Sequence, residues 1–110
     1  MKSIDEKYFS VTLDSGALIV DFNGTASQIS GYSKKELLGK NWFEIFIPDS
    51  NIVEVLGVFS SIFNGNNTSW EYENEITIKD GSLKTIKWQN SIIKNDRNQP
   101  LFIHSLGTEV

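Results

Sequence analysis

With 110 residues, 39% of them apolar and 12% aromatic, the chain can bury one core and is too short for two domains. Ten basic residues against fourteen acidic ones give a net charge of −4, and the scattered basic residues exclude a phosphate-neutralising surface, so no nucleic-acid partner is expected. The absence of cysteine excludes disulfides, thiolate metal sites and cysteinyl adducts. No apolar run approaches the roughly 20 residues of a membrane span, and the N-terminus has no apolar signal segment. These features predict a cytoplasmic protein without direct membrane contact.

The first part of the chain predicts a hairpin followed by short helices. Apolar and polar residues alternate over 9–13, and an apolar run over 17–22 follows the turn residues Ser15-Gly16. Asn23 is a favoured N-cap, because its side chain accepts a hydrogen bond from a backbone N–H of the first helical turn. A second short helix is predicted at the capping box Ser33-Lys-Lys-Glu36.

One longer helix is predicted over 51–63, where apolar residues recur at i, i+3, i+4 and i+7. Asp49 or Ser50 is the expected N-cap, and Gly65-Asn66-Asn67 is expected to end the helix.

Three closing strands are predicted over 69–79, 83–94 and 101–106, and the hairpin signal Asp80-Gly81 joins the first two. Two strands, short helices, one longer helix and a three-stranded meander predict an α+β fold. We expect a five-stranded antiparallel sheet with the helices packed across one face.

The order and spacing of several motifs resemble the PAS family. The matching segments are Ile19–Asn23, Ile29–Lys40, Trp42–Asp49, Lys79–Gly81, Lys87-Trp88 and Leu106–Val110, the later ones resembling the C-terminal PAC half of the motif. The family often closes with Gly-x-Asp, and Glu109 stands at that Asp position. The resemblance implies a PAS domain over 9–110 preceded by a flanking segment over 1–8. It also implies that the chain is part of a larger signalling protein with a covalently linked output domain.

Period-two alternation and the resemblance together predict a cavity between the sheet and the helices. Alternation puts Tyr72 and Asn74 on one side of their strand, and Ile86, Trp88 and Asn90 on one side of the next. Similarity to flavin-binding PAS relatives implies that these sides face the helices and that Ile103, Ser105 and Gly107 also point inward. The predicted lining residues are Phe59, Ile62, Tyr72, Asn74, Ile86, Trp88, Asn90 and Ser105, with Trp70 as a further aromatic wall.

Asn74 and Asn90 have two interpretations. A buried amide needs hydrogen-bond partners, so the two residues either form the polar edge of a ligand site or bond to each other, to backbone or to water in a filled core. A cavity of a few hundred Å³ would favour sensing, on the order of known ligand pockets. A closed, dry core would favour a scaffold.

The main expectation is that the domain has no cofactor, no metal and no catalytic residue. The family resemblance implies that a haem would take its axial histidine from the long helix, yet the single histidine is His104 on the last strand. A covalent flavin adduct lacks its cysteine, whereas a non-covalent flavin or a small metabolite is left open. Alternation turns Glu71, Glu73 and Glu75 toward solvent, so they do not form an acid–base pair.

Alternation also predicts an apolar outer face of the sheet. Tyr8, Phe102, His104 and Leu106 are predicted to form a homodimer interface there, with Ile4, Tyr8 and Phe9 as the segment that could cover it. The signal is expected to leave through Leu106, Gly107 and Glu109. Glu109 is expected to pair with Lys34, Lys35 or Lys40.

The sequence therefore favours a non-enzymatic sensory or relay domain, and by analogy one from a histidine kinase of a two-component phosphorelay. The alternative is a ligand-free dimerisation module of a signalling or transcription regulator. A third interpretation, a small enzyme resembling steroid isomerases, needs an inward Asp or Glu, and the predicted faces supply none.

Overall fold

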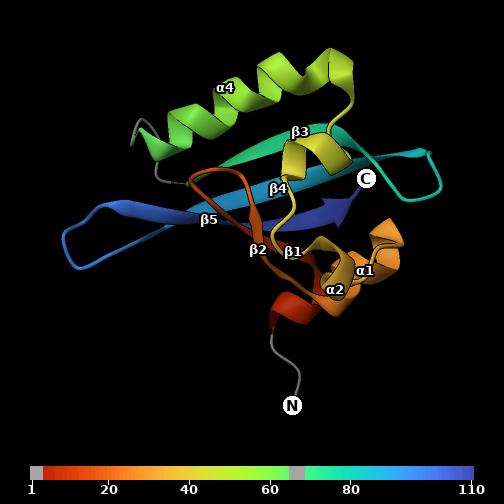
Figure 1. Ribbon diagram of the computed structural model, residues 1–110, viewed down its shortest axis with the longest axis horizontal. Coiled ribbons are helices and arrows are strands. Elements are labelled where there is room, and N and C mark those ends of the chain that lie inside the picture. Colours follow the sequence, from red (N-terminus) through yellow and green to blue (C-terminus); the bar gives the residue numbers. More distant parts are fainter. Residues whose placement is uncertain (1–3, 65–68) are drawn as a thin grey trace.

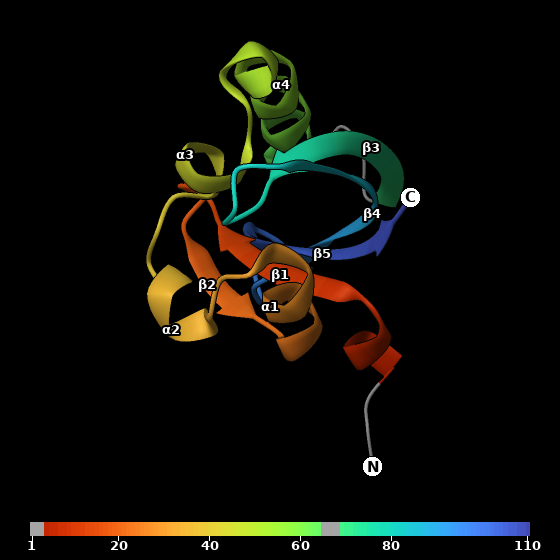
Figure 2. The same ribbon diagram turned by 90° about the vertical axis from the view of Figure 1, so that its right-hand side faces the viewer.

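The computed structural model describes residues 4–64 and 69–110, which form a curved five-stranded sheet with helices beside it (Figures 1 and 2). The strands are β1 (Phe9–Asp14), β2 (Ile19–Phe22), β3 (Ser69–Thr77), β4 (Leu83–Lys94) and β5 (Pro100–Glu109). Their order across the sheet is β2-β1-β5-β4-β3, and every neighbouring pair is antiparallel. The predicted α+β fold with a five-stranded antiparallel sheet is confirmed.

Helices contribute to the same core as the strands. They are η1 (Ile4–Lys7), α1 (Gly24–Ser30), α2 (Lys34–Leu37), α3 (Trp42–Phe46), η2 (Asp49–Asn51) and α4 (Ile52–Phe63). Ala26 of α1, Leu37 of α2, Phe46 of α3 and Val55 of α4 join inward-facing strand residues such as Ile76 in one cluster. In Figure 1, α4 lies over β3 and β4, apart from α1 and α2.

The short helices begin where side-chain caps are available. The Asn23 side chain accepts from the Ala26 N–H at 2.8 Å, and Ser33 with Glu36 forms the predicted capping box. Sequence reasoning did not identify Asn41, whose side chain accepts from the first turn of α3. Each cap satisfies backbone N–H groups that a helix start leaves unpaired.

The predicted end of the longest helix at Phe63 is confirmed, but its predicted N-caps are wrong. Asp49 and Ser50 lie in the 3₁₀ turn η2, and α4 starts after Asn51, which makes no side-chain capping bond. Because this turn precedes α4, Asn51 takes the N-cap position, and the two predicted caps lie before it. The C-cap is Asn64, and the predicted stop Gly65-Asn66-Asn67 lies outside the described residues.

An aromatic cluster organises the core around Phe9. This side chain is wholly buried, and its ring meets those of Phe22, Trp42, Phe46 and Trp88 edge-on, at centroid distances of 5.4, 6.1, 6.2 and 5.2 Å. The prediction that Phe9 helps to cover the outer sheet face is therefore wrong. The alternation of β1 turns Phe9 inward with Val11 and Leu13, which are also buried.

An ion pair joins Glu36 of α2 to Lys79, which lies two residues after the end of β3. The Lys79 ammonium lies 2.7 Å from the Glu36 carboxylate, which also accepts from the Ser33 N–H at 2.7 Å. The hydrogen bond from Lys79, followed by that from the Ser33 backbone, lowers the pKa of Glu36 from 4.5 to about 2. A carboxyl group with a depressed folded-state pKa stabilises the fold above its unfolded pKa, and that contribution is lost as pH falls through the folded value.

Glu36→Gln is therefore expected to lower the Tm at neutral pH. Glutamine keeps the capping box but loses the charge that attracts Lys79. The difference from wild type should shrink as pH falls below about 4.5 and vanish only below about pH 2, where Glu36 is protonated in the folded protein too. Thermal unfolding followed by circular dichroism across this range measures the effect, with Glu73→Gln, an exposed β3 glutamate, as the control. A deficit independent of pH would contradict the ion-pair explanation.

Candidate ligand-binding cavity

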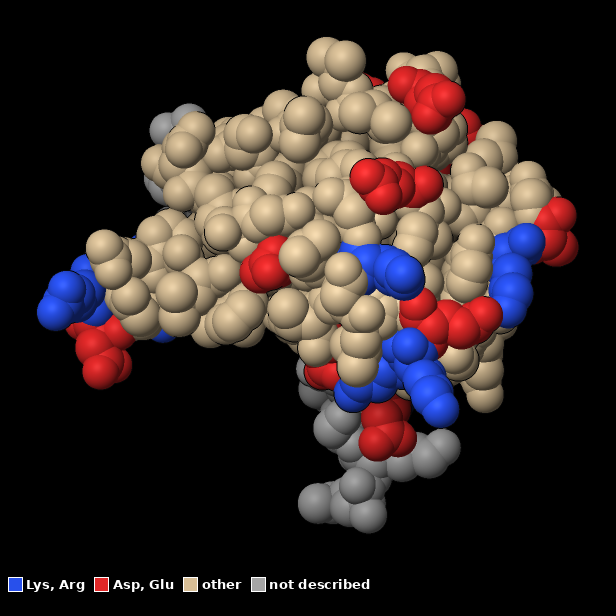
Figure 3. Space-filling view, viewed as in Figure 1, with Lys and Arg blue, Asp and Glu red and all other residues tan. Residues whose placement is uncertain are grey.

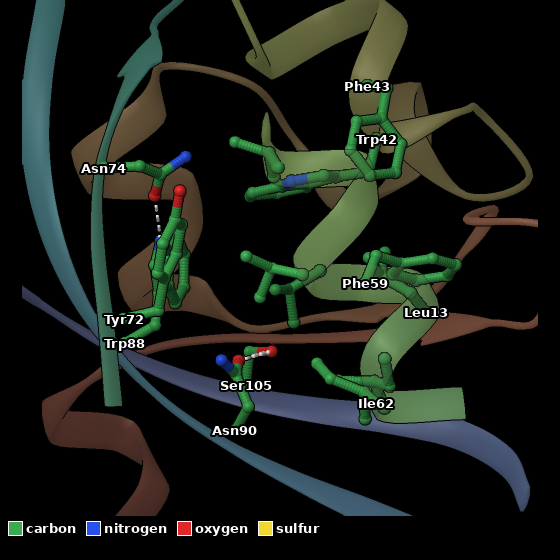
Figure 4. A pocket seen from close by; sticks show the side chains of 14 residues that line it. Leu13, Trp42, Phe43, Phe59, Ile62, Tyr72, Asn74, Trp88, Asn90 and Ser105 are labelled. Atoms are coloured by element: carbon green, nitrogen blue, oxygen red, sulfur yellow. Dashed lines mark hydrogen bonds between the residues drawn. The ribbon is translucent and has the colours of Figure 1, made fainter. Parts of the chain in front are cut away.

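A cavity of about 60 Å³ lies between α4 and the inner face of the sheet, and with its open mouth the space reaches about 480 Å³ (Figure 4). Its lining residues are Val11, Leu13, Trp42, Phe43, Val55, Val58, Phe59, Ile62, Tyr72, Asn74, Trp88, Asn90, Ile103 and Ser105. The volume of about 60 Å³ is smaller than the few hundred Å³ expected for a sensing cavity. The core is not closed, however, so it does not match the closed core expected for a scaffold either. The cavity exceeds the ~10–15 Å³ that one water needs.

Seven of the eight predicted lining residues border this cavity. They are Phe59, Ile62, Tyr72, Asn74, Trp88, Asn90 and Ser105. The Trp70 side chain lies outside the described residues. The prediction for Ile86 is wrong: it points inward and is wholly buried, but it does not line the cavity.

Gly107 leaves space for both Trp88 and Ile86 next to β5. Trp88 stands opposite Gly107 on β5, and an added Cβ on Gly107 would come within 2.6 Å of both the Trp88 ring and Ile86. The missing side chain on Gly107 thus gives the indole and Ile86 room beside β5. Trp88 reaches the cavity, whereas Ile86 fills the space next to Gly107.

Two hydrogen bonds between side chains form the polar wall of the cavity on the sheet side. The Trp88 Nε1–H donates to Asn74 Oδ1 at 2.7 Å, and the Ser105 hydroxyl bonds to Asn90 Oδ1 at 2.5 Å (Figure 4). The strand register brings the second pair together, because Asn90 stands opposite Ser105. Both amides thus find partners, as buried polar groups must. The two amides bond to neighbouring side chains rather than to each other.

The helix-side wall is apolar and was only partly predicted. Val55, Val58, Phe59 and Ile62 come from α4, while Trp42 and Phe43 come from α3. Helical spacing identifies the apolar face of α4 but not which of its residues border an unfilled space. Val11 and Leu13 on β1 could have been found from their inward alternation.

Tyr72 lies beside an acidic residue of α4. Burial raises the pKa of Tyr72, and the negative charge of the nearby Glu54 carboxylate raises it further. Glu54 thus places a negative charge close to Tyr72, although Glu54 does not itself line the cavity.

The cavity lining carries no formally charged side chain. Among the described residues no Asp, Glu, His, Lys or Arg lines the cavity, and Tyr72 is its one lining phenol. No group of three or more potential metal ligands is found in the described ranges 4–64 and 69–110. Within these ranges no helix is long and apolar enough to cross a membrane.

The predicted exit of the signal lies on β5, which runs through Glu109. The prediction that Glu109 pairs with Lys34, Lys35 or Lys40 is wrong. Its carboxylate lies 3.4 Å from the ammonium of Lys84 on the adjacent β4, whereas Lys34 pairs with Asp21 at 2.8 Å. Antiparallel pairing of β4 and β5 brings Glu109 next to Lys84, a contact between strands that spacing in the sequence does not reveal.

The outer face of β5 carries the residues predicted for a dimer interface. Phe102, His104 and Leu106 alternate with inward Ile103 and Ser105 and are half-buried. The neighbouring outer-face contact is between His104 Nδ1 and the Thr12 hydroxyl at 2.9 Å. Tyr8 is half-buried just before β1, and its carbonyl accepts from the Asn23 amide. The Ile4 side chain lies outside the described residues.

Charged groups of both signs are mixed on the face of the molecule in Figure 3. Lysine and arginine gather there beside aspartate and glutamate, and the part over α4 is almost uncharged. This face therefore carries no continuous basic surface of the kind that binds a nucleic-acid backbone.

The sequence and the fold are similar to those of known proteins. A family model described as PAS fold matches residues 19–106. No curated protein matches the sequence. The PAS domain of the quorum-sensing receptor RpfR from Cronobacter turicensis, solved in complex with BDSF, superposes with a TM-score of 0.82 at 21% identity over 100% of this chain and 98% of that one.

Two further solved structures share the fold. The PAS domain of a Colwellia psychrerythraea protein has a TM-score of 0.83 at 21% identity, covering 93% of this chain and 85% of that one. Drosophila melanogaster Cycle PAS-B with bound ethylene glycol has a TM-score of 0.77 at 14% identity, covering 93% and 99%. Because the family match spans most of the chain and the sheet has the same architecture as these domains, the chain belongs to the PAS fold family of sensory domains.

Proposed function

We propose that this domain senses a small molecule in the cavity between α4 and the sheet and relays its presence through β5 to a linked output domain. The observation that carries the proposal is a polar wall that includes two amides, in a cavity otherwise lined mainly by apolar side chains. An apolar pocket with a few oriented polar groups is the usual form of a small-molecule site.

Two neighbours in fold support this use of the cavity. The RpfR PAS domain was solved in complex with BDSF and with C12:0, and Cycle PAS-B with bound ethylene glycol. These two domains are only 21% and 14% identical to this chain, so the comparison shows a shared fold and not a shared ligand. The ligand class of this chain is therefore inferred from its own lining residues.

The route of the signal follows the contacts of Trp88. This side chain lines the cavity and packs against Gly107 of β5, so a ligand that shifts the indole also shifts the strand at Leu106, Gly107 and Glu109. A ligand that favours one packing of these groups shifts the population of the domain. The domain spans 9–110, catalyses no reaction itself, and serves a cytoplasmic histidine kinase in a two-component phosphorelay.

The proposal includes a homodimer through the outer sheet face. Tyr8, Phe102, His104 and Leu106 lie there partly exposed, and Ile93, opposite Phe102 on β4, is 43% exposed. Apolar surface of this kind commonly marks an interaction site. Native mass spectrometry of freshly purified protein reports the subunit number, and a monomer at high micromolar concentration would remove the dimer from the proposal.

The test of sensing is a cavity-filling variant with a control on the same helix. Benzyl alcohol, indole, pentan-2-one, butanoate and pentan-2-ammonium serve as probes in ¹H–¹⁵N NMR titrations. Wild-type protein is expected to bind at least one probe, with resonance shifts at the lining residues and along β5 as far as Glu109. Val58→Phe fills the cavity and should abolish these shifts, whereas Val53→Phe, at a side chain 86% exposed on α4, should preserve them.

The second candidate function, a ligand-free dimerisation module, is favoured by the small enclosed volume of about 60 Å³. It predicts that no probe shifts the lining residues at tens of millimolar and that Val58→Phe only perturbs packing. Binding that survives Val58→Phe would place the site elsewhere and overturn the sensing proposal.

A further inference from the structure

We infer that the cavity selects a small uncharged molecule with a hydrogen-bond acceptor, such as a ketone, ester or lactone, over carboxylates and amines. The inference rests on the proposed function and adds the chemical class of the ligand. It follows from which ends of the two amides are already bonded.

The orientation of Asn74 is fixed by its partner. An indole N–H only donates, so the atom 2.7 Å from Trp88 Nε1 must be the amide oxygen. The Asn74 amino group is therefore the end left for other partners, and it makes only a long 3.4 Å bond to the Glu75 carbonyl. This assignment depends on the chemistry of tryptophan and not on how the amide atoms are labelled.

Asn90 presents the same end. Its oxygen accepts from the Ser105 hydroxyl at 2.5 Å, and its amino group has no hydrogen bond to any residue the structure describes. That amino group is not sealed off, since no buried side-chain nitrogen or oxygen lacks a partner within the described ranges. The sheet side of the cavity thus offers two amide donors, while each amide oxygen already accepts one hydrogen bond.

Charge in and around the cavity disfavours an ionic ligand. No cationic side chain lines it, so a carboxylate would leave water without a countercharge. The Glu54 carboxylate of α4 lies near enough to raise the pKa of Tyr72, and it repels an anion. A cation would meet the positive ends of two amide dipoles and the apolar wall of α4. A neutral hydrogen-bond acceptor has no charge that needs a counterion, and neither Glu54 nor the amide dipoles repel it.

A matched series of probes tests the charge class. Pentan-2-one, butanoate, pentan-2-ammonium and 2-methylpent-1-ene have nearly the same shape and differ in acceptor and charge. Wild-type protein in ¹H–¹⁵N NMR titrations should bind pentan-2-one at least ~10-fold more tightly than either ion, because an unpaired charge is costly to bury. The alkene, which cannot accept a hydrogen bond, should bind several-fold more weakly than the ketone. The side-chain NH₂ resonances of Asn74 and Asn90 should shift with the ketone.

Asn90→Leu removes one donor at nearly constant volume, and Gln89→Leu, the adjacent outward residue of β4, is its control. The preference for ketone over alkene should fall in Asn90→Leu and persist in Gln89→Leu. Butanoate binding within about threefold of pentan-2-one by wild type would overturn the inference while leaving sensing intact, as would an undiminished ketone preference in Asn90→Leu. Failure of every probe, by contrast, would contradict the sensing proposal.

Discussion

Replacing Phe9 by alanine is expected to lower the free energy of unfolding by about 3–5 kcal/mol, the range for truncating a buried phenylalanine. The side chain is wholly buried, and its ring contacts four other aromatic rings from β2, α3 and β4. These neighbours belong to separate elements, so they cannot all move into the space that a lost phenyl group leaves. Urea unfolding followed by tryptophan fluorescence measures the loss.

Phe102→Ala is the matched control for Phe9→Ala. Phe102 lies half-buried on the outer face of β5, so its truncation should cost much less. A cost for Phe9→Ala no larger than that of Phe102→Ala would contradict the packing described for the core. The result also bears on the domain boundary, because Phe9 precedes the segment 19–106 that matches the family.

Gly107→Ala is expected to destabilise the domain by about 1–3 kcal/mol, the usual cost of overpacking a core. The added methyl group would lie 2.6 Å from the Trp88 ring and from Ile86, so β4 and β5 must separate or the indole must turn. The Tm should fall by roughly 4–8 °C for each kcal/mol in a domain of this size. Because Trp88 lines the cavity, the substitution should also weaken probe binding and change the tryptophan emission.

Gly57→Ala is the control for this substitution. Gly57 lies within α4, and an added Cβ there meets no atom within 4 Å. Alanine in a helix interior is favoured over glycine by about 0.8–1 kcal/mol, so this variant should be slightly stabilised. If Gly107→Ala were as stable as wild type, the close approach of Trp88 and Ile86 to β5 would be wrong.

Local signals in the sequence determined most of the secondary structure. The caps at Asn23 and Ser33 and the Asp80-Gly81 turn each depend on residues within a few positions of one another. The inward set of β4 follows from period-two alternation once one face is buried, since a shift by one residue would expose Trp88 and bury Lys87. Alternation thus separates the two faces of each strand, and the resemblance to PAS relatives implied which face points to the helices. Together they predicted seven of the residues that line the cavity.

Only the tertiary structure decided which side chains meet. Asn74 bonds to Trp88, Asn90 to Ser105 and Glu109 to Lys84 across strands paired over 14 to 25 residues of sequence. Likewise, Ile86 and Trp88 share an inward face and both pack beside Gly107, yet only Trp88 lines the cavity. Register, side-chain volume and the direction of a neighbouring strand act together at such points. Because none of them is encoded within a short window, the sequence alone leaves these contacts open.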